Sequence, residues 1–183
     1  MTRFCVVDLE TTGLDAKHDS ILEIGAIMVD DNLEAILGLT NFHTVIRWRG
    51  DCRRFPPVVQ KMHTDSGLFN VCYSSKVIAP QAILDFTLWC EESIVDDPGE
   101  VYFTGNNIKF DLGFLEENGF TAPPGIHYRS VDISSIKVLT NTWIGDDTAT
   151  LKKPESKALH RSIPDCYDSI AELAWYKQLL WSY

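Results

Sequence analysis

The chain has 183 residues, of which 45% are hydrophobic, so it is long enough to bury a core and too apolar to be intrinsically disordered. Its net charge of −10 argues against an extended basic face for long nucleic acids, unless the substrate is short or a divalent metal supplies positive charge locally. The sequence has no apolar run of membrane-spanning length and no signal-peptide pattern, so we expect a cytoplasmic protein without contact to a membrane. Its five cysteines are scattered and form no C-x-x-C pair, so we expect no disulfides. The length fits one domain, residues 1–183.

The N-terminal quarter of the sequence predicts an antiparallel meander. Residues 3–8 and 21–29 are apolar runs typical of buried strands, and the polar residues 14–20 form a loop between them. Turn-forming residues at 30–32 separate the second run from a third predicted strand at 35–48.

The remainder predicts alternating helices and strands. Residues 49–78 show no regular periodicity and are interpreted as irregular. The later elements are helices at 79–93, 109–117, 133–139 and 162–181, strands at 101–104 and 127–131, and a loop at 141–158. This order predicts an α/β fold, in which helices flank a mixed sheet with an antiparallel part and a parallel part.

Asp8 and Glu10 are the first candidate functional residues. They alternate with Leu9 along the first strand, so both carboxylates point to the same face of the sheet and repel each other. A cation between them would relieve this repulsion, and carboxylate oxygens suit Mg²⁺ or Mn²⁺. An exposed edge strand with two solvated acids explains this stretch equally well when it is taken alone.

Three later residues offer matching chemistry. Asp111 lies one turn into the helix that follows the strand at 101–104, near the strand ends where ligand sites of α/β sheets gather, although by itself it is better explained as an acid at a helix N-terminus. Asp165 lies in the first turn of the last helix, where it also fits a capping arrangement with Ser162. His160, in the loop before that helix, is either a surface histidine or a general base suited to neutral pH.

Taken together, these residues resemble the motifs of a known family. The three motifs of DnaQ-like 3′–5′ exonucleases of the DEDDh type are similar to Asp8-x-Glu10, Gly105-Asn-Asn-x-x-Phe-Asp111-x-x-Phe-Leu115 and His160-x-x-x-x-Asp165, which span nearly the whole chain. Within that superfamily the chain is most similar to oligoribonuclease, through Asp8-Leu-Glu10-Thr-Thr-Gly-Leu14, His63-Thr-Asp-Ser-Gly-Leu68, His127-Tyr-Arg129 and His160-Arg-Ser-Ile-Pro-Asp165.

The resemblance implies a ribonuclease H-like fold with five strands and a metal-dependent hydrolase. The expected reaction releases nucleoside 5′-monophosphates from the 3′ end of short single-stranded RNA. Two divalent ions, Mg²⁺ or Mn²⁺, would be held by the four carboxylates, with Asp8 bridging them, and His160 would deprotonate the attacking water. The carboxylates are those of Asp8, Glu10, Asp111 and Asp165.

The resemblance also implies which residues hold the substrate. Leu14 would wedge against the terminal base, and the backbone of Thr11 and Thr12 would hold the 3′ end. Other matched positions would cap the 5′ phosphate, and in oligoribonucleases the Tyr–Arg pair among them comes from the partner subunit of a homodimer. These positions are His63, Tyr128, Arg129 and Ser134, and Asn107 is a further substrate-binding candidate, at a position that helps to hold a dinucleotide in the family. A turn leucine and a surface salt bridge are the alternatives for Leu14 and Arg129.

Three positions depart from the oligoribonuclease pattern, and they keep other functions open. Thr12, Val58 and Asn107 stand where that family usually has Met, Trp and Ser, and the Trp and Ser help to hold a dinucleotide. One alternative is therefore a broader exonuclease for single-stranded DNA or RNA, of the proofreading type. The other is a non-catalytic nucleic-acid-binding module on the same fold, which the complete set of five catalytic-type residues disfavours.

Overall fold

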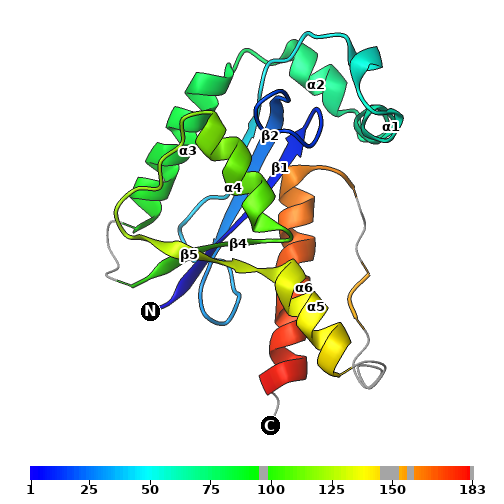
Figure 1. The fold of residues 1–183 in the computed structure, drawn as a ribbon. Helices are drawn as coiled ribbons and strands as arrows, with labels where there is room; N and C mark the ends of the chain where they lie inside the picture. Colours follow the sequence, from blue (N-terminus) through cyan, green and yellow to red (C-terminus); the bar gives the residue numbers. More distant parts are fainter. Residues whose placement is uncertain (95–98, 145–152, 156–158, 182–183) are drawn as a thin grey trace.

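A computed structural model of the chain describes residues 1–94, 99–144, 153–155 and 159–181. Its centre is a five-stranded sheet in the order β3-β2-β1-β4-β5 (Figure 1). The strands are β1 (Arg3–Thr11), β2 (Ile21–Val29), β3 (Phe42–Val45), β4 (Val101–Gly105) and β5 (Ile126–Asp132). The pairs β1–β2 and β2–β3 are antiparallel, whereas β1–β4 and β4–β5 are parallel. The predicted mixed five-stranded sheet is therefore confirmed.

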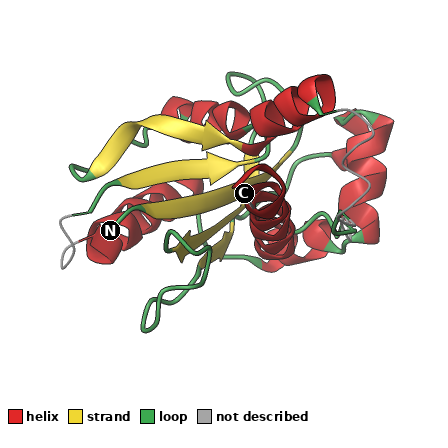
Figure 2. Cartoon of the chain, turned by 90° about the horizontal axis from the view of Figure 1, so that it is seen from below, coloured by secondary structure: helices red, strands yellow, loops and turns green. Residues whose placement is uncertain are grey.

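The side chains of β1 alternate between the two faces of the sheet, and different helices cover each face (Figure 2). Cys5, Val7 and Leu9 pack with α3 (Ala79–Ile94) and α4 (Ile108–Glu117) in the largest hydrophobic cluster. Val6 belongs to a second cluster, which includes Cys166 of the last helix, α6 (Ser162–Trp181). Asp8 and Glu10 share the parity of Val6, so the sheet directs both carboxylates toward α6.

The prediction for residues 49–78 was wrong, because this segment contains helical structure. A short 3₁₀ turn, η1 (Cys52–Arg54), precedes α1 (Pro57–Asp65) and α2 (Leu68–Ser74). Proline suits the first position of α1, and Gly67, with a φ of 71°, separates the two helices in a left-handed conformation. Each helix buries only two side chains, so neither leaves a long periodic pattern in the sequence.

The third predicted strand was too long, since β3 covers only four residues. Leu37 is fully exposed and Gly38 has a φ of 90°, so the segment before β3 is a loop despite its apolar residues. After β3, the amide of Ile46 still donates to Leu22, but that of Trp48 donates to the carbonyl of Cys72 in α2.

The other predicted elements lie close to their expected positions. Asp132 caps α5 (Ile133–Trp143) by accepting a hydrogen bond from the Ser134 amide, and this helix runs past the predicted end at residue 139. Of the predicted loop at 141–158, the first residues belong to α5, and 145–152 and 156–158 lie outside the described residues. Within the described part of the chain, the helices are all too short or too polar to cross a membrane.

Gly25 allows α6 to begin directly against the sheet. It pairs with Asp8 across β1 and β2, and a Cβ at this position would lie 2.6 Å from the hydroxyl oxygen and 2.8 Å from the backbone carbonyl carbon of Ser162. Because the backbone of α6 must move to accommodate a side chain there, we expect Gly25→Ala to lower the free energy of unfolding by about 1–3 kcal/mol in urea titrations. The matched control is Gly113→Ala in α4, where the added methyl meets nothing within 4 Å and should be neutral or stabilising. Equal stability of the two variants would contradict this account.

Candidate active site

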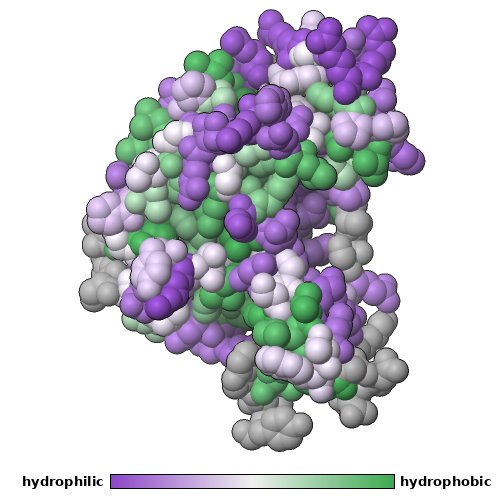
Figure 3. Space-filling view, viewed as in Figure 1, coloured by the Kyte–Doolittle hydropathy of each residue, from purple (hydrophilic) through white to green (hydrophobic). Residues whose placement is uncertain are grey.

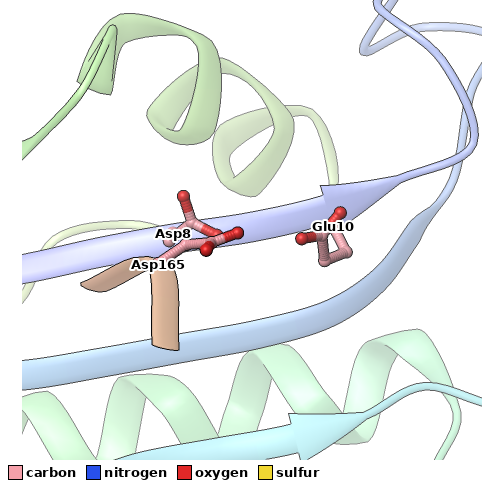
Figure 4. Close-up of side chains that lie close together, drawn as sticks. All are labelled: Asp8, Glu10 and Asp165. Atoms are coloured by element: carbon pink, nitrogen blue, oxygen red, sulfur yellow. The ribbon is translucent and has the colours of Figure 1, made fainter. Parts of the chain in front are cut away.

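Three carboxylates converge on the α6 side of the sheet (Figure 4). Asp8 and Glu10 project from β1, and Asp165 projects from the first turn of α6. One oxygen atom of each carboxylate lies within 4.8 Å of the others. Oxygen donors at this spacing are suited to a hard divalent cation, which would relieve the repulsion among them.

Asp111 borders this group from the first turn of α4. Strand β4 pairs with β1 only as far as Val6, so the amide of Leu9 further along β1 has no partner from β4. The buried Asp111 carboxylate accepts a hydrogen bond from that amide at 3.0 Å. This bond holds Asp111 beside β1, close enough for its charge to act on Asp8.

The electrostatics of these acids show a shortage of positive charge. Burial, followed by the negative charges of Asp111 and Glu10, raises the pKa of Asp8 well above its ordinary value. Burial, followed by the charge of Asp165, raises the pKa of Glu10 to about 8. Burial also raises the pKa of Asp111 to about 7 and shifts that of Asp165 upward. Without a cation, Glu10 and Asp111 therefore titrate near neutral pH.

This shortage predicts that stability without metal falls as pH rises from about 6.5 to 8. In the unfolded chain the same carboxyl groups ionise near pH 4, whereas in the fold Glu10 and Asp111 have pKa values of about 8 and about 7. The folded state therefore binds more protons than the unfolded state in this window, so the free energy of unfolding falls as pH rises. Burial lowers the pKa of His63, so that residue titrates below the window.

Thermal unfolding with EDTA and with Mn²⁺ at pH 6.5 and 8 measures the effect. We expect the melting temperature in EDTA to fall by several degrees, and Mn²⁺ to raise it more at pH 8 than at pH 6.5. A melting temperature that rises with pH in EDTA would contradict the assignment of unpaired acids.

His160 lies at the mouth of the same site. It adopts a left-handed φ of 51°, which is uncommon for a residue with a side chain. Together with Asp8 and Asp165 it lines a cavity of about 460 Å³, whose far wall includes Lys137 and Glu172. The imidazole and two of the carboxylates therefore face one space that a substrate can enter.

The loop after β1 places three predicted substrate-binding residues next to the acids. The Thr11 hydroxyl donates to the Gly13 carbonyl at 2.7 Å, and the Thr12 hydroxyl donates to Asp19 at 3.1 Å. Leu14 follows at the loop tip and is 84% exposed. The two threonine side chains thus shape the loop, while Leu14 is free to meet a ligand.

His63 is placed differently from a residue that caps a substrate phosphate. It is fully buried in α1, its Nε2 lies 2.8 Å from the Thr11 carbonyl oxygen, and its Nδ1 lies 3.7 Å from Glu10. In this conformation its side chain is out of contact with solvent and supports the end of β1 beside Glu10.

The remaining predicted substrate residues divide into two places. The backbone N–H of Asn107 donates to the Ser134 hydroxyl at 2.6 Å and to the Asp132 carboxylate at 3.0 Å, so these residues meet where β4 and β5 end. Tyr128 and Arg129 are exposed on β5, with the guanidinium 4.8 Å from the ring centre. They line a separate cavity of about 400 Å³, so one subunit does not bring them to the acids.

Sequence reasoning missed a buried acid beside the cluster, Glu23. It pairs with Glu10 across β1 and β2 and is fully buried. Burial alone would raise the pKa of Glu23, but hydrogen bonds from His43, Arg161 and the Ser162 amide lower it to about 2. The available signal was a lone charged residue inside the apolar run 21–29, since such a residue needs a partner when buried.

The mixed sheet and the converging carboxylates define a ribonuclease H-like, metal-dependent nuclease. The chain belongs to the exonuclease family RNase_T, which residues 5–173 match. The family's metal dependence fits the acidic cluster described above. The predicted assignment to the DnaQ-like 3′–5′ exonucleases is confirmed.

Within this family, the chain is similar to proteins that carry the name oligoribonuclease. The chain is 35% identical to an oligoribonuclease of Streptomyces coelicolor, over 96% of this chain and 86% of the relative. It is 34% identical to an oligoribonuclease of Corynebacterium glutamicum, over 96% of this chain and 78% of the relative. The fold resembles that of E. coli exonuclease I in complex with a 5cy-dA13 oligonucleotide, with a TM-score of 0.69 and 14% identity, over 97% of this chain and 41% of exonuclease I.

Proposed function

We propose that the chain removes nucleoside 5′-monophosphates one at a time from the 3′ end of short single-stranded RNA. The convergence of Asp8, Glu10 and Asp165 beside His160 carries this proposal. The oligoribonuclease names of the relatives support short RNA as the substrate. The net charge of −10 also favours short substrates, because a long polyanion would be repelled wherever no metal shields the surface.

The four carboxylates would hold two divalent ions, Mg²⁺ or Mn²⁺. Asp8 would bridge the ions, Glu10 and Asp165 would complete one position, and Asp111 would support the other. When bound, such ions neutralise charge on the phosphate and favour hydroxide at neutral pH. The upward pKa shifts of these acids fit this role, because burial and neighbouring negative charges disfavour the ionised carboxylates, and a bound cation would favour them.

His160 would act as the general base. Its imidazole accepts a proton from the attacking water as the water oxygen forms a bond to phosphorus. The bond from phosphorus to the 3′ oxygen of the preceding nucleotide then breaks, and that oxygen leaves with a proton from solvent. The products are a nucleoside 5′-monophosphate and a chain shortened by one nucleotide with a free 3′ hydroxyl.

The substrate would lie along the loop after β1 and the ends of β4 and β5. Leu14 would contact the terminal base, the backbone of Thr11 and Thr12 would hold the 3′ end, and Asn107 and Ser134 would approach the next phosphate. His63 would act indirectly by supporting Thr11 and Glu10, which revises its expected contact with the phosphate.

We also propose a homodimer in which Tyr128 and Arg129 reach the partner's site. Both residues are exposed on β5, the last strand of the sheet, and exposed hydrophobic side chains extend over α5, including Val138 and Trp143 (Figure 3). Light scattering measures the mass, and mixing Arg129→Ala with Asp8→Asn tests the exchange. Two variants that are inactive alone should regain activity together, because a mixed dimer contains one intact site. A monomeric mass, or a mixture without activity, would contradict the arrangement.

The cysteines support a reducing compartment such as the cytoplasm as the place of action. All five are free thiols, and four of them are buried. Buried unpaired thiols are typical of proteins that fold where disulfides are kept reduced.

A single assay tests the proposed function against its alternatives. Purified protein with Mn²⁺ is given an RNA dinucleotide, a long single-stranded RNA and a DNA of the same sequence, with Asp8→Asn as the inactive control. We expect the dinucleotide to be hydrolysed fastest. Faster loss of the long DNA would favour the proofreading-type alternative, which gains support from the exposed Val58 and from Asn107. Tight binding without turnover would indicate a binding module.

A further inference from the structure

An ion pair between the buried Glu23 and the partly buried Arg161 links the sheet to the residue that follows His160. Arg161 donates to both oxygens of Glu23 through Nε at 3.0 Å and to one of them through Nη2 at 2.6 Å. The Ser162 amide donates to the same carboxylate at 3.1 Å, and His43 Nε2 lies 2.6 Å from it. Glu23 thus fixes the last loop residue and the first helical residue of α6 to the first part of β2.

We propose that Glu23 and Arg161 are positioning residues that hold His160 and Asp165 at the acid cluster. This inference rests on the proposed function, in which His160 is the general base. His160 immediately precedes Arg161, and Asp165 lies one turn after Ser162, so one anchor sets the direction of both side chains.

The backbone at His160 shows why an anchor is needed. A left-handed φ of 51° costs energy for a residue with a Cβ, so the loop requires contacts on either side to keep this conformation. The bidentate pair with Arg161 supplies a rigid planar contact on one side of His160.

A contribution to the free energy of folding is a poor explanation for the ion pair between Glu23 and Arg161. Removing charges from water offsets much of what a buried ion pair gains, so hydrophobic residues could hold α6 at least as strongly. Gly25 already lets α6 pack closely on β2. What the ion pair adds is a fixed orientation of the backbone between His160 and Ser162.

A double-mutant cycle on dinucleotide hydrolysis tests the positioning role. We expect Arg161→Met to lower kcat about 30- to 100-fold, as for a small displacement of a reacting group, and to change KM by less than about threefold. In a His160→Asn background the same substitution should cost clearly less than it does in the wild type, because the part of the loss that acts through the imidazole is already removed and only the part that acts through Asp165 remains. Arg161→Lys should recover part of the loss. The control is Lys177→Met, which removes a cation from α6 that donates to the Asp31 carbonyl, and it should leave kcat unchanged.

Arg161→Met leaves the charge of the buried Glu23 without its arginine partner, and this alone can prevent the protein from folding. A second variant separates this effect from positioning. The double variant Glu23→Gln/Arg161→Met removes both charges, so it should fold with a melting temperature near that of the wild type and still show the loss of kcat. If the losses from Arg161→Met and His160→Asn multiply, the positioning role is wrong. It is also wrong if the folded Glu23→Gln/Arg161→Met variant has wild-type kcat. Neither result would contradict the proposed function. A wild-type protein that does not hydrolyse the dinucleotide would overturn the proposed function, and this inference with it.

Discussion

Asp8→Asn is expected to lower kcat by at least about 10⁴-fold, a loss at or beyond the upper end of what a general base contributes. Asp8 lies in the cluster with Glu10 and Asp165 and is also within electrostatic reach of Asp111. The substitution keeps the shape of the side chain but removes the charge at the point shared by the proposed metal positions. Steady-state hydrolysis of a dinucleotide in saturating Mn²⁺ measures the loss.

The same variant should not be less stable than the wild type without metal. Burial and neighbouring acids raise the pKa of Asp8 well above its ordinary value, so a neutral amide relieves repulsion that the fold tolerates only for function. The matched control is Asp85→Asn on α3, a partly exposed acid whose partner, the side-chain amide of Gln81, can still donate to asparagine. Near-wild-type activity of Asp8→Asn would remove the acid cluster from the mechanism.

His160→Asn is expected to lower kcat by about 10²- to 10⁴-fold, the range typical of a general base. Asparagine tolerates a left-handed φ, so the backbone should stay in place and the loss should report the imidazole. KM should change little, because the proposed role of His160 lies in proton transfer.

The pH dependence separates this role from a structural one. Without the imidazole, hydroxide from solvent must replace the general base, so the rate of the variant should keep rising with pH where the wild-type rate levels off. The control is His18→Asn in the exposed loop after β1, which leaves the cavity unchanged. Parallel pH profiles of His160→Asn and the wild type would contradict the assignment.

Periodicity in the sequence was sufficient to predict most of the sheet and the long helices. The nine residues of β2 are all buried, and α3 and α6 bury continuous stripes, so each leaves a long pattern. The segment around Leu37 and Gly38 misled the prediction because Leu37 is fully exposed, and Ile36 and Leu39 pack on the core only in part. Nothing in a local pattern distinguishes an exposed leucine from a buried one.

The helices α1 and α2 were missed for the opposite reason. They are short and bury only Val59, His63, Leu68 and Cys72, so their positions depend on contacts with the end of β1 and with β2. Tertiary contacts of this kind do not appear in a single sequence.

The candidate site was predicted from a family resemblance, and its supporting residues were not. The motifs name the side chains that face a ligand, which is why Asp8, Glu10, Asp165 and His160 were expected together. Glu23 and Arg161 are not among the residues that line the cavity, and they contact each other although 138 positions separate them in the sequence, so only the fold reveals them.

The location of Asp165 near the end of the chain has a consequence during synthesis. The ribosome releases β1 long before it releases α6, and until the final helix docks, Asp8 and Glu10 lack the third carboxylate and the imidazole. A chain that lacks α6 therefore has only part of the acid cluster, and we expect hydrolytic activity only after residues 160–181 have been made and α6 has docked on the sheet.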